Sequence, residues 1–227
     1  MSLVLYYHPL ASFCHKVLIA LYENETPFIP RSVDLMDADD AAAFFKLWPV
    51  GKMPLLRDDA RDRTIAETSI IIEYLDRHYP GASPLLPVNE GARLDARLWD
   101  RFYDLYVQVP MQKIVTDRIR PDGCQDPHGV AAARHDLQTA YGMIEREMAG
   151  KTWAAGDAFS IADCAAAPAL FYAGIVVPFS TTHPNTAAYF ERLLARSSVK
   201  RVIAEAQPYF GSFPYRDQLP ARFAPPA

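Results

Sequence analysis

The chain has 227 residues, half of them hydrophobic, and its 23 basic and 27 acidic residues give a net charge of −4. This amount of apolar material can build the core of one large domain or two small ones, and it argues against a disordered protein. Neither half of the chain is basic and no lysine or arginine cluster follows a helix face, so we expect no nucleic acid partner.

Other features of the composition bear on location and metals. No apolar run is long enough to span a membrane, and the first residues lead directly into strand-like sequence without a signal peptide. The three cysteines, Cys14, Cys124 and Cys164, are odd in number and widely separated. They fit neither a disulfide framework nor a zinc site. We therefore expect a cytoplasmic protein with no metal and no membrane partner.

The first part of the chain has the pattern of a βαβ unit. Residues 3–7 predict a short strand, and the apolar spacing of residues 14–21 predicts an amphipathic helix with Ser12 as its cap. Residues 28–33 predict a second strand. Strand, helix and strand within about thirty residues imply that the two strands pair in parallel. Residues 37–47 predict a short helix.

The stretch of residues 50–74 predicts a hairpin that leads into a helix. Leu55 and Leu56 form a short apolar run, a charged turn follows over residues 58–62, and residues 64–66 run back. This alternation of an apolar run, a polar turn and a returning run is typical of two antiparallel strands.

The helix after the hairpin begins near Glu67 and Thr68 and should end near His78. A helix start carries unpaired amide N–H groups and partial positive charge, so it can hold a carboxylate. The Met53–Pro54 bond can be cis, which turns the Met53 backbone outward. A strand edge beside a helix start suits a small peptide with an acidic end; an ordinary loop and an ordinary helix cap are the alternative. The apolar stripe of this helix consists of Ile70, Ile71, Tyr74 and Leu75.

Beyond this helix the sequence predicts helices only. Residues 80–87 are rich in proline and mark a linker. Residues 90–120 and 128–148 carry apolar side chains at helical spacing. Residues 160–163 are close to a capping box, and they precede an alanine-rich helix that should be buried. Pro168 should kink this helix or lie where its first turns end. The C-terminal end should be an extended tail. The apolar positions noted in the first of these helical stretches are Leu94, Leu98, Phe102 and Leu105.

Three short motifs resemble a known family. Gly51-Lys52-Met53-Pro54, Glu67-Thr68-Ser69-Ile70 and Tyr74-Leu75 are similar to the glutathione-binding half of the cytosolic glutathione S-transferases, of the bacterial type with a Ser- or Cys-like motif near the N-terminus. Thr68 stands where the family more often has Ser, and Ile71 where Ala is common. The resemblance implies a thioredoxin-like domain of order βαβ-α-ββα over residues 1–79, a linker over 80–90 and an all-α domain over 91–227.

The same resemblance implies an enzyme that binds glutathione as co-substrate, stabilises its thiolate and adds it to a hydrophobic electrophile, as in detoxification. It assigns Glu67 and Thr68 to the γ-glutamyl end of glutathione, and the Met53 backbone, shaped by Pro54, to the cysteinyl part. Lys52 would face the glycine carboxylate, for which a cation is suited. The electrophile would occupy an apolar pocket between the domains, and a homodimer is implied by the resemblance alone. Aromatic side chains that could line this pocket are Phe13, Phe102, Tyr103 and Tyr106.

A hydrogen bond to the thiolate would lower the pKa of the glutathione thiol, and the family uses a Tyr, Ser or Cys near the first helix as donor. If Cys14 is aligned with the second cysteine of a Ser-x-x-Cys or Cys-x-x-Cys motif, the donor position falls on Ala11. Its side chain has no polar group, so we favour Ser12 at the helix start as the catalytic residue. Tyr7 is a second candidate. Cys14 lies in the apolar stripe and is more typical of a buried thiol, and His15 is expected on the solvated face.

An alanine at the usual donor position also supports another class of function. The chain can be a non-catalytic glutathione-binding or interaction module with the same fold. Within the enzyme class, a glutathione-dependent isomerase or dehalogenase would use the same binding residues. The identity of the electrophile depends on a pocket shaped by several segments of the chain.

Overall fold

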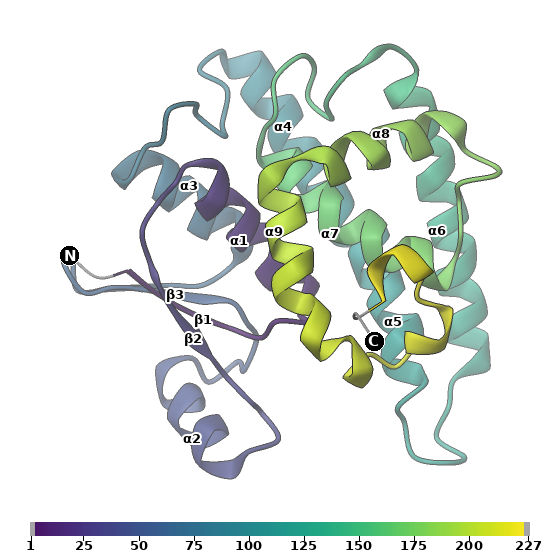
Figure 1. Ribbon diagram of the computed structural model, residues 1–227, viewed down its shortest axis with the longest axis horizontal. Helices are drawn as coiled ribbons and strands as arrows, with labels where there is room; N and C mark the ends of the chain where they lie inside the picture. The colour runs from purple at the N-terminus through teal and green to yellow at the C-terminus, as the bar shows by residue number, and fades with distance from the viewer. Residues whose placement is uncertain (1–2, 225–227) are drawn as a thin grey trace.

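The computed structural model describes residues 3–224, which form a small mixed sheet with helices followed by a helical bundle (Figure 1). In the sheet the strand order is β2-β1-β3-β4; β1 and β2 are parallel, and the other neighbours are antiparallel. The predicted order βαβ-α-ββα is therefore confirmed. The elements of this half are β1 (Leu3–Tyr7), α1 (Ser12–Glu23), β2 (Ile29–Ser32), α2 (Ala38–Leu47), β3 (Leu55–Asp58), β4 (Arg63–Ile65) and α3 (Thr68–His78).

The sheet is covered on both faces, as a thioredoxin-like domain requires. Successive side chains of a strand point to opposite faces. Leu3 and Leu5 of β1 are buried with the apolar residues of α1 and α3. Tyr6 belongs to the other face and contacts Phe44 of α2, with ring centroids 6.3 Å apart. Figure 1 accordingly shows α2 on the opposite side of the sheet from α1 and α3.

In the second half, the described residues form helices joined by loops and no strand, as predicted. Its first long helix changes type in the middle: α4 (Glu90–Phe102) continues as the π-helical turn η1 (Tyr103–Gln108) and then as α5 (Val109–Asp117). The remaining helices are α6 (Pro127–Glu147), α7 (Ile161–Val176), α8 (Pro184–Ala195) and α9 (Ser197–Ala206), with short 3-10 turns η2 (Met148–Gly150), η3 (Gln207–Ser212), η4 (Arg216–Gln218) and η5 (Ala221–Phe223).

Helix α7 is the centre of the bundle, and all but one of its residues are buried. The predicted capping box is present: Asp163 accepts hydrogen bonds from the N–H and the hydroxyl of Ser160, at 2.9 and 3.0 Å. The same carboxylate accepts a bond from the Tyr189 hydroxyl at 2.6 Å. The helix continues through Pro168 to Val176, with the proline in its interior. Small side chains let α1 and α4 pack closely against α7.

Two expectations about the helical half need correction. Residues 207–223 do not form an extended tail: they contain three 3-10 turns, and Arg222 of the last turn is ion-paired with Glu191 of α8 at 2.8 Å. The apolar positions Leu94 and Leu98 of α4 are 69% and 61% exposed, because Ala96 and the residues in phase with it form the buried face. No helix within residues 3–224 is both long and apolar enough to cross a membrane.

Candidate glutathione-binding site

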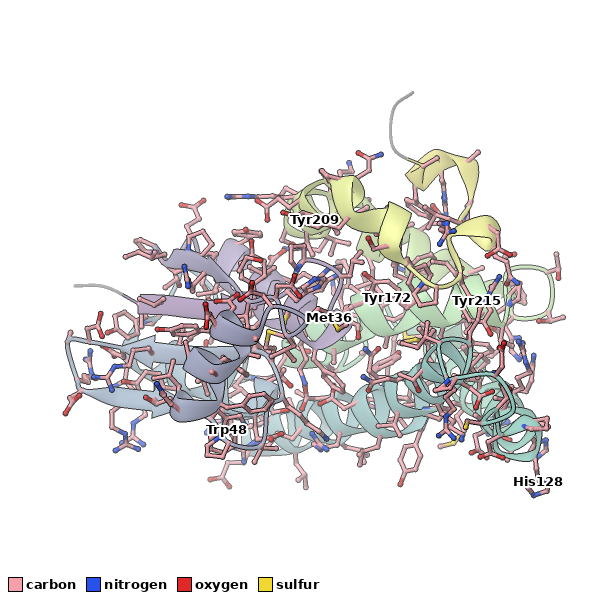
Figure 2. All side chains as sticks on the ribbon, turned by 90° about the horizontal axis from the view of Figure 1, so that it is seen from below. Met36, Trp48, His128, Tyr172, Tyr209 and Tyr215 are labelled. Carbon is pink, nitrogen blue, oxygen red and sulfur yellow. The ribbon has the colours of Figure 1, made fainter. Side chains whose placement is uncertain are left out.

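A cavity of about 210 Å³ lies where the two halves of the molecule meet. It contains residues of the loop before β3, of the start of α3, and of the continuous helix α4-η1-α5. Five residues predicted for glutathione binding are among them. Figure 2 shows one wall residue, Trp48, at the junction between the sheet-containing half and the teal helices. The lining residues are Phe13, Trp48, Lys52, Met53, Pro54, Glu67, Thr68, Arg101, Asp104, Leu105, Val109 and Gln112.

The loop before β3 supplies the first wall. The Met53–Pro54 peptide bond is cis, as the sequence allows, and Pro54 is buried directly before the first residue of β3. Met53 packs beside the cluster of Val33, Phe44 and Leu55. Within residues 3–224 the Met53 backbone forms no hydrogen bond of its own. Its N–H and carbonyl are therefore available to an extended peptide that adds to this edge.

The start of α3 supplies the second wall. Glu67 is the residue before the helix, and its backbone has φ 68° and ψ 118°, a conformation that L-residues rarely adopt. A non-glycine residue in such a region costs about 1–3 kcal/mol, and residues of this kind cluster at functional sites. The Glu67 carbonyl accepts the Ile71 N–H at 2.8 Å, which closes the first helical turn. The amides of the first turn have no partner within the helix and can bind a carboxylate.

The helical half supplies the third wall, which the sequence did not reveal. Arg101, Asp104 and Gln112 face the cavity from α4, η1 and α5. Asp104 is buried and accepts a hydrogen bond from Arg101 at 3.0 Å. Burial raises the pKa of the Asp104 carboxyl above its usual value, although the nearby Lys16 ammonium acts in the opposite direction. The one sequence signal that would have indicated this wall is Asp104 itself, an acidic residue in an otherwise apolar helical stretch.

The aromatic residues suggested for an electrophile pocket lie in three different environments in the structure. Phe13 lines the cavity. Phe102 and Tyr103 are buried in the core of the bundle, and Tyr106 is 58% exposed. Phe102 and Tyr103 meet edge-on, with ring centroids 5.9 Å apart, which is the packing of core aromatics.

Ser12 is the first residue of α1 and not its cap, so the expectation of a serine cap is wrong. Ala11 is the capping residue, with extended backbone angles and no side-chain hydrogen bond. Its carbonyl accepts the amides of Cys14 at 2.8 Å and His15 at 3.1 Å, which starts the helix one residue earlier. Ser12 is half-buried beside Phe13, and it is not among the residues that line the cavity. Its role as thiolate donor stays a prediction.

The other candidates for sulfur chemistry are in environments that disfavour charge. Burial raises the pKa of the Tyr7 hydroxyl, and the nearby Glu205 carboxylate adds to this effect. Burial also raises the pKa of the Cys14 thiol to about 12. His15 is buried, so the expectation of a solvated residue is wrong. Its Nε2 lies 2.5 Å from the Pro9 carbonyl, which can only accept, and burial lowers its pKa to about 4.

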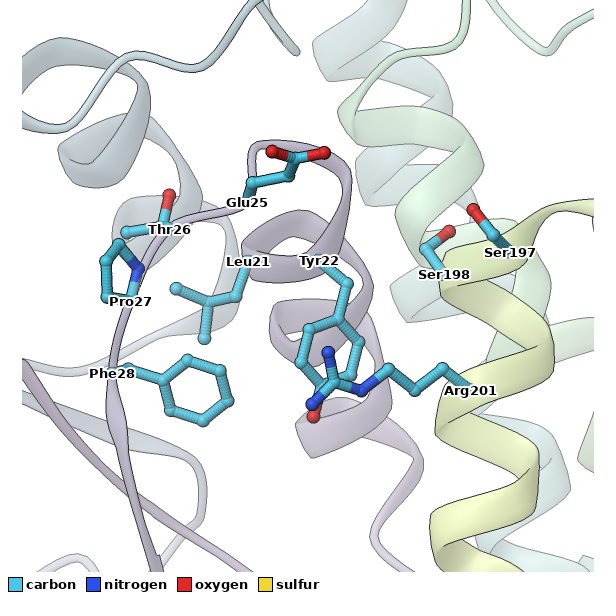
Figure 3. Close-up of a pocket in the computed structure, with 9 residues that line it drawn as sticks. All are labelled: Leu21, Tyr22, Glu25, Thr26, Pro27, Phe28, Ser197, Ser198 and Arg201. Carbon is cyan, nitrogen blue, oxygen red and sulfur yellow. The ribbon is translucent and has the colours of Figure 1, made fainter.

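A larger hollow, of about 540 Å³, lies at the other end of α1 and contains none of the predicted site residues (Figure 3). The Arg201 guanidinium lies over the Tyr22 ring at 3.8 Å and pairs with Glu205 at 2.9 Å. The guanidinium and the aromatic ring that line this hollow therefore already have partners within the protein. Within residues 3–224, no three histidine, cysteine or acidic side chains are grouped so that they could hold a metal ion.

Comparison with known proteins gives the family. Residues 5–83 match the model of the glutathione S-transferase N-terminal domain, and residues 102–197 match that of the C-terminal domain. The chain is 28% identical to glutathione S-transferase GstB of Escherichia coli over 83% of this chain and 91% of GstB. It is 27% identical to a stringent starvation protein A homolog of Coxiella burnetii, over 90% of this chain and 93% of that protein.

A solved structure supports the same assignment. A glutathione S-transferase of Methylobacterium radiotolerans, crystallised in complex with glutathione sulfonate, superimposes with a TM-score of 0.79 at 25% identity. The match covers 89% of this chain and 94% of that one. Two adjoining domain models that together span most of the chain, a shared fold and the cavity residues agree with one another. The chain belongs to the glutathione S-transferase family.

Proposed function

We propose that the protein is a glutathione transferase that binds glutathione in the interdomain cavity, stabilises its thiolate and adds the sulfur to a hydrophobic electrophile. The observation that supports this most is the convergence of two separate segments on one cavity. Lys52, Met53 and Pro54 come from the loop before β3, whereas Glu67 and Thr68 come from the start of α3. Relatives with the same fold bind glutathione derivatives, as in the Methylobacterium protein.

The walls of the cavity suit the separate parts of the tripeptide. The α-carboxylate of the γ-glutamyl end would bind the free amides and the Thr68 hydroxyl at the start of α3. The unpaired Met53 backbone would bind the cysteinyl part. Lys52 is exposed and can approach the glycine carboxylate. The chain direction of the ligand thus runs from the start of α3 towards the loop before β3.

The reaction would then begin at the start of α1. The Ser12 hydroxyl would donate a hydrogen bond to the sulfur, which favours the thiolate and lowers the pKa of the thiol. The thiol proton leaves to solvent. The sulfur lone pair forms a bond to the electrophilic carbon, and the electron pair of the broken bond goes to the leaving group or to the opened ring oxygen.

Two measurements test this proposal. Purified protein is mixed with reduced glutathione and chlorodinitrobenzene, and then with a panel of epoxides, halides and peroxides. Turnover with at least one of them is expected. Calorimetry with reduced glutathione at millimolar concentration should give measurable heat, and protein that is folded but gives none would contradict the assignment of the cavity.

A second candidate function is a glutathione-binding or interaction module without catalysis. The observation that favours it is Ala11 as the cap of α1, with Ser12 outside the cavity lining. One of the curated relatives is named for stringent starvation and not for a transferase reaction. Titration of bound glutathione, followed by thiolate absorbance near neutral pH, separates the two. An unshifted thiol pKa would support the module, and a pKa lowered towards neutrality would support the enzyme or a glutathione-dependent isomerase or dehalogenase.

A homodimer is part of the proposal, and an exposed apolar face supports it. Leu94 and Leu98 of α4 are 69% and 61% exposed and lie one helical turn apart on the same face, and Ile70 of α3 is 54% exposed. Exposed apolar patches mark interaction surfaces. Light scattering on purified protein should give twice the monomer mass, and Leu98→Asp should shift it towards the monomer. A monomeric wild type would reject the dimer and leave the glutathione site untouched.

We also propose a cytoplasmic location and a part in detoxification. Reduced glutathione and free thiols coexist in a reducing compartment. Cys14, Cys124 and Cys164 are all free in the structure, in agreement with this. Cell fractionation with an antibody against the protein tests the location, and survival of a deletion strain on electrophiles tests the role.

A further inference from the structure

Lys16, in the middle of α1, is 1% exposed, which is unusual because lysine is almost never fully buried unless it is paired. Its ammonium is ion-paired with the Asp100 carboxylate at 2.6 Å and donates to Asp104 at 2.7 Å. It also donates to the Ser69 hydroxyl at 3.1 Å, and that hydroxyl in turn donates to Asp100 at 2.5 Å. One buried cation therefore contacts three acceptors.

The three acceptors come from three different elements. Ser69 is in the first turn of α3, Asp100 is in α4 and Asp104 is in the π-helical turn η1. The half-exposed Arg101 pairs with Asp104 at 3.0 Å, so two cations balance two carboxylates. The cluster of Lys16, Ser69, Asp100 and Asp104 thus joins the sheet-containing half of the molecule to the helical half.

This cluster is next to the cavity on two sides. Thr68, which lines the cavity, directly precedes Ser69, and Asp104 is itself a wall residue. Removing buried charges from water costs several kcal/mol per ion, so an ion cluster of this kind is a weak source of stability compared with apolar packing. What the cluster provides is a defined geometry: the ammonium has three donors, and each acceptor lies on a different element.

We infer that Lys16 is a positioning residue for the cavity: its ammonium holds the start of α3 in register with the wall formed by α4 and η1. The consequence for ligand binding rests on the proposed function, whereas the consequence for the geometry of the two walls does not. Lys16 is not among the residues that line the cavity, and it acts only through Ser69 and Asp104.

The molecule contains a matched control. Arg97 of α4 donates to Glu73 of α3 at 2.9 and 2.5 Å, so this pair joins the same two helices. Neither residue lines the cavity, and Arg97 is half-exposed. An effect that arises from any link between α3 and α4 should appear in both Lys16→Met and Arg97→Met. An effect on the position of the cavity walls should appear only in Lys16→Met.

The test uses the full chain and measures amide hydrogen exchange in two segments: residues 71–73 of α3, whose N–H groups bond back to the start of the helix, as Ile71 does to the Glu67 carbonyl at 2.8 Å, and η1. In Lys16→Met both segments should exchange about tenfold faster than in the wild type, as expected for loss of hydrogen bonds to a buried charge. In Arg97→Met the change should stay within about twofold. Equal protection of these segments in Lys16→Met and Arg97→Met would overturn the inference.

Calorimetry adds the affinity for glutathione, a quantity that a change in stability alone does not alter while the protein stays folded. The dissociation constant of reduced glutathione should rise about tenfold in Lys16→Met, with folded protein at the measured temperature, and remain near the wild-type value in Arg97→Met. If Lys16→Met does not fold, Ser69→Ala removes one acceptor and should raise exchange at residues 71–73 of α3 about threefold; unchanged exchange would overturn the inference. Wild-type protein that binds no glutathione would refute the proposed function, and hydrogen exchange would still decide the role of Lys16.

Discussion

The starts of α3 and α1 contribute to the same interdomain region by different means. At α3, Glu67 holds a rare backbone conformation, the first amides are free, and the Thr68 hydroxyl forms no hydrogen bond within residues 3–224. At α1, Ala11 is an ordinary cap, Cys14 is a buried thiol, and His15 is neutral beneath the first turn. The α3 start combines free backbone amides with a hydroxyl, which suits the anion site proposed there. The α1 start has one hydroxyl, that of Ser12, for the proposed chemistry.

The largest expected effect concerns the neutral His15 at the start of α1. Its pKa is about 4 in the folded protein and 6.5 in the unfolded chain, so the unfolded state binds the proton more readily. The stability that this provides is complete above pH 6.5 and is lost as the pH falls towards 4. By linkage the loss is about 3 kcal/mol.

Urea unfolding at a series of pH values measures this effect. The free energy of unfolding of the wild type should fall between pH 6.5 and 4.5 more steeply than that of His15→Gln. His135→Gln, at an exposed position of α6, is the control and should keep the wild-type slope. Parallel curves for the wild type and His15→Gln would mean that the α1 start is more hydrated than its burial indicates.

The second effect concerns catalysis at α1. Ser12→Ala should lower kcat/KM at least about tenfold, or about 1.4 kcal/mol, if the hydroxyl stabilises the thiolate. Ser197 is a matched control because it is also the first residue of a helix whose cap residue, here Arg196, does not bond the helix amides through its side chain. Ser197→Ala should leave steady-state kinetics unchanged. An unchanged rate in Ser12→Ala would transfer the role to Tyr7 or to backbone amides.

The corresponding change at α3 should affect binding and not the chemical step. Thr68→Val keeps the shape of a buried side chain and removes its hydroxyl. We expect the KM for glutathione to rise about fivefold, which corresponds to the loss of one hydrogen bond of about 1 kcal/mol, with kcat nearly constant. A fall in kcat at constant KM would show that the two helix starts do not divide binding and chemistry between them.

The smallest effect isolates the backbone conformation of Glu67. At most positions glycine destabilises relative to alanine, whereas at a positive φ glycine is the better residue. Glu67→Gly should therefore be more stable than Glu67→Ala by about 1 kcal/mol. Thermal unfolding of the two variants gives the difference. The reverse order would show that the conformation of Glu67 relaxes without strain.

Local patterns were sufficient for much of the fold and for the lining residues that come from the loop before β3 and the start of α3. Residues 50–74 contain the turn, the proline and the helix start in one continuous stretch, so their arrangement depends mainly on neighbours in the chain. The capping box of Ser160 and Asp163 is local in the same sense, and it was predicted correctly. The helix that it opens is buried, as its alanine-rich composition indicated.

The features that the sequence did not reveal depend on distant partners. Lys16 looks like a solvated helix residue until Asp100 and Asp104 are brought to it from more than eighty positions away. Leu94 and Leu98 look like a core stripe, but α4 presents its opposite face to α7. The cap of α1 is Ala11 and not the predicted Ser12, because the backbone at Ala11 is extended and its carbonyl accepts the first helical amides.

The π-helical turn η1 has a consequence for how this cavity can change. A turn with bonds from i to i+5 takes up more residues than an α-helical turn, and everything after it is rotated about the helix axis. Leu105 lies within that turn, and Val109 and Gln112 follow it on the cavity wall. Deleting a single residue between Tyr103 and Gln108 would rephase the downstream wall by roughly 100° and present a new set of side chains. The set of side chains that faces the cavity can therefore change through chain length alone, without any substitution at the wall.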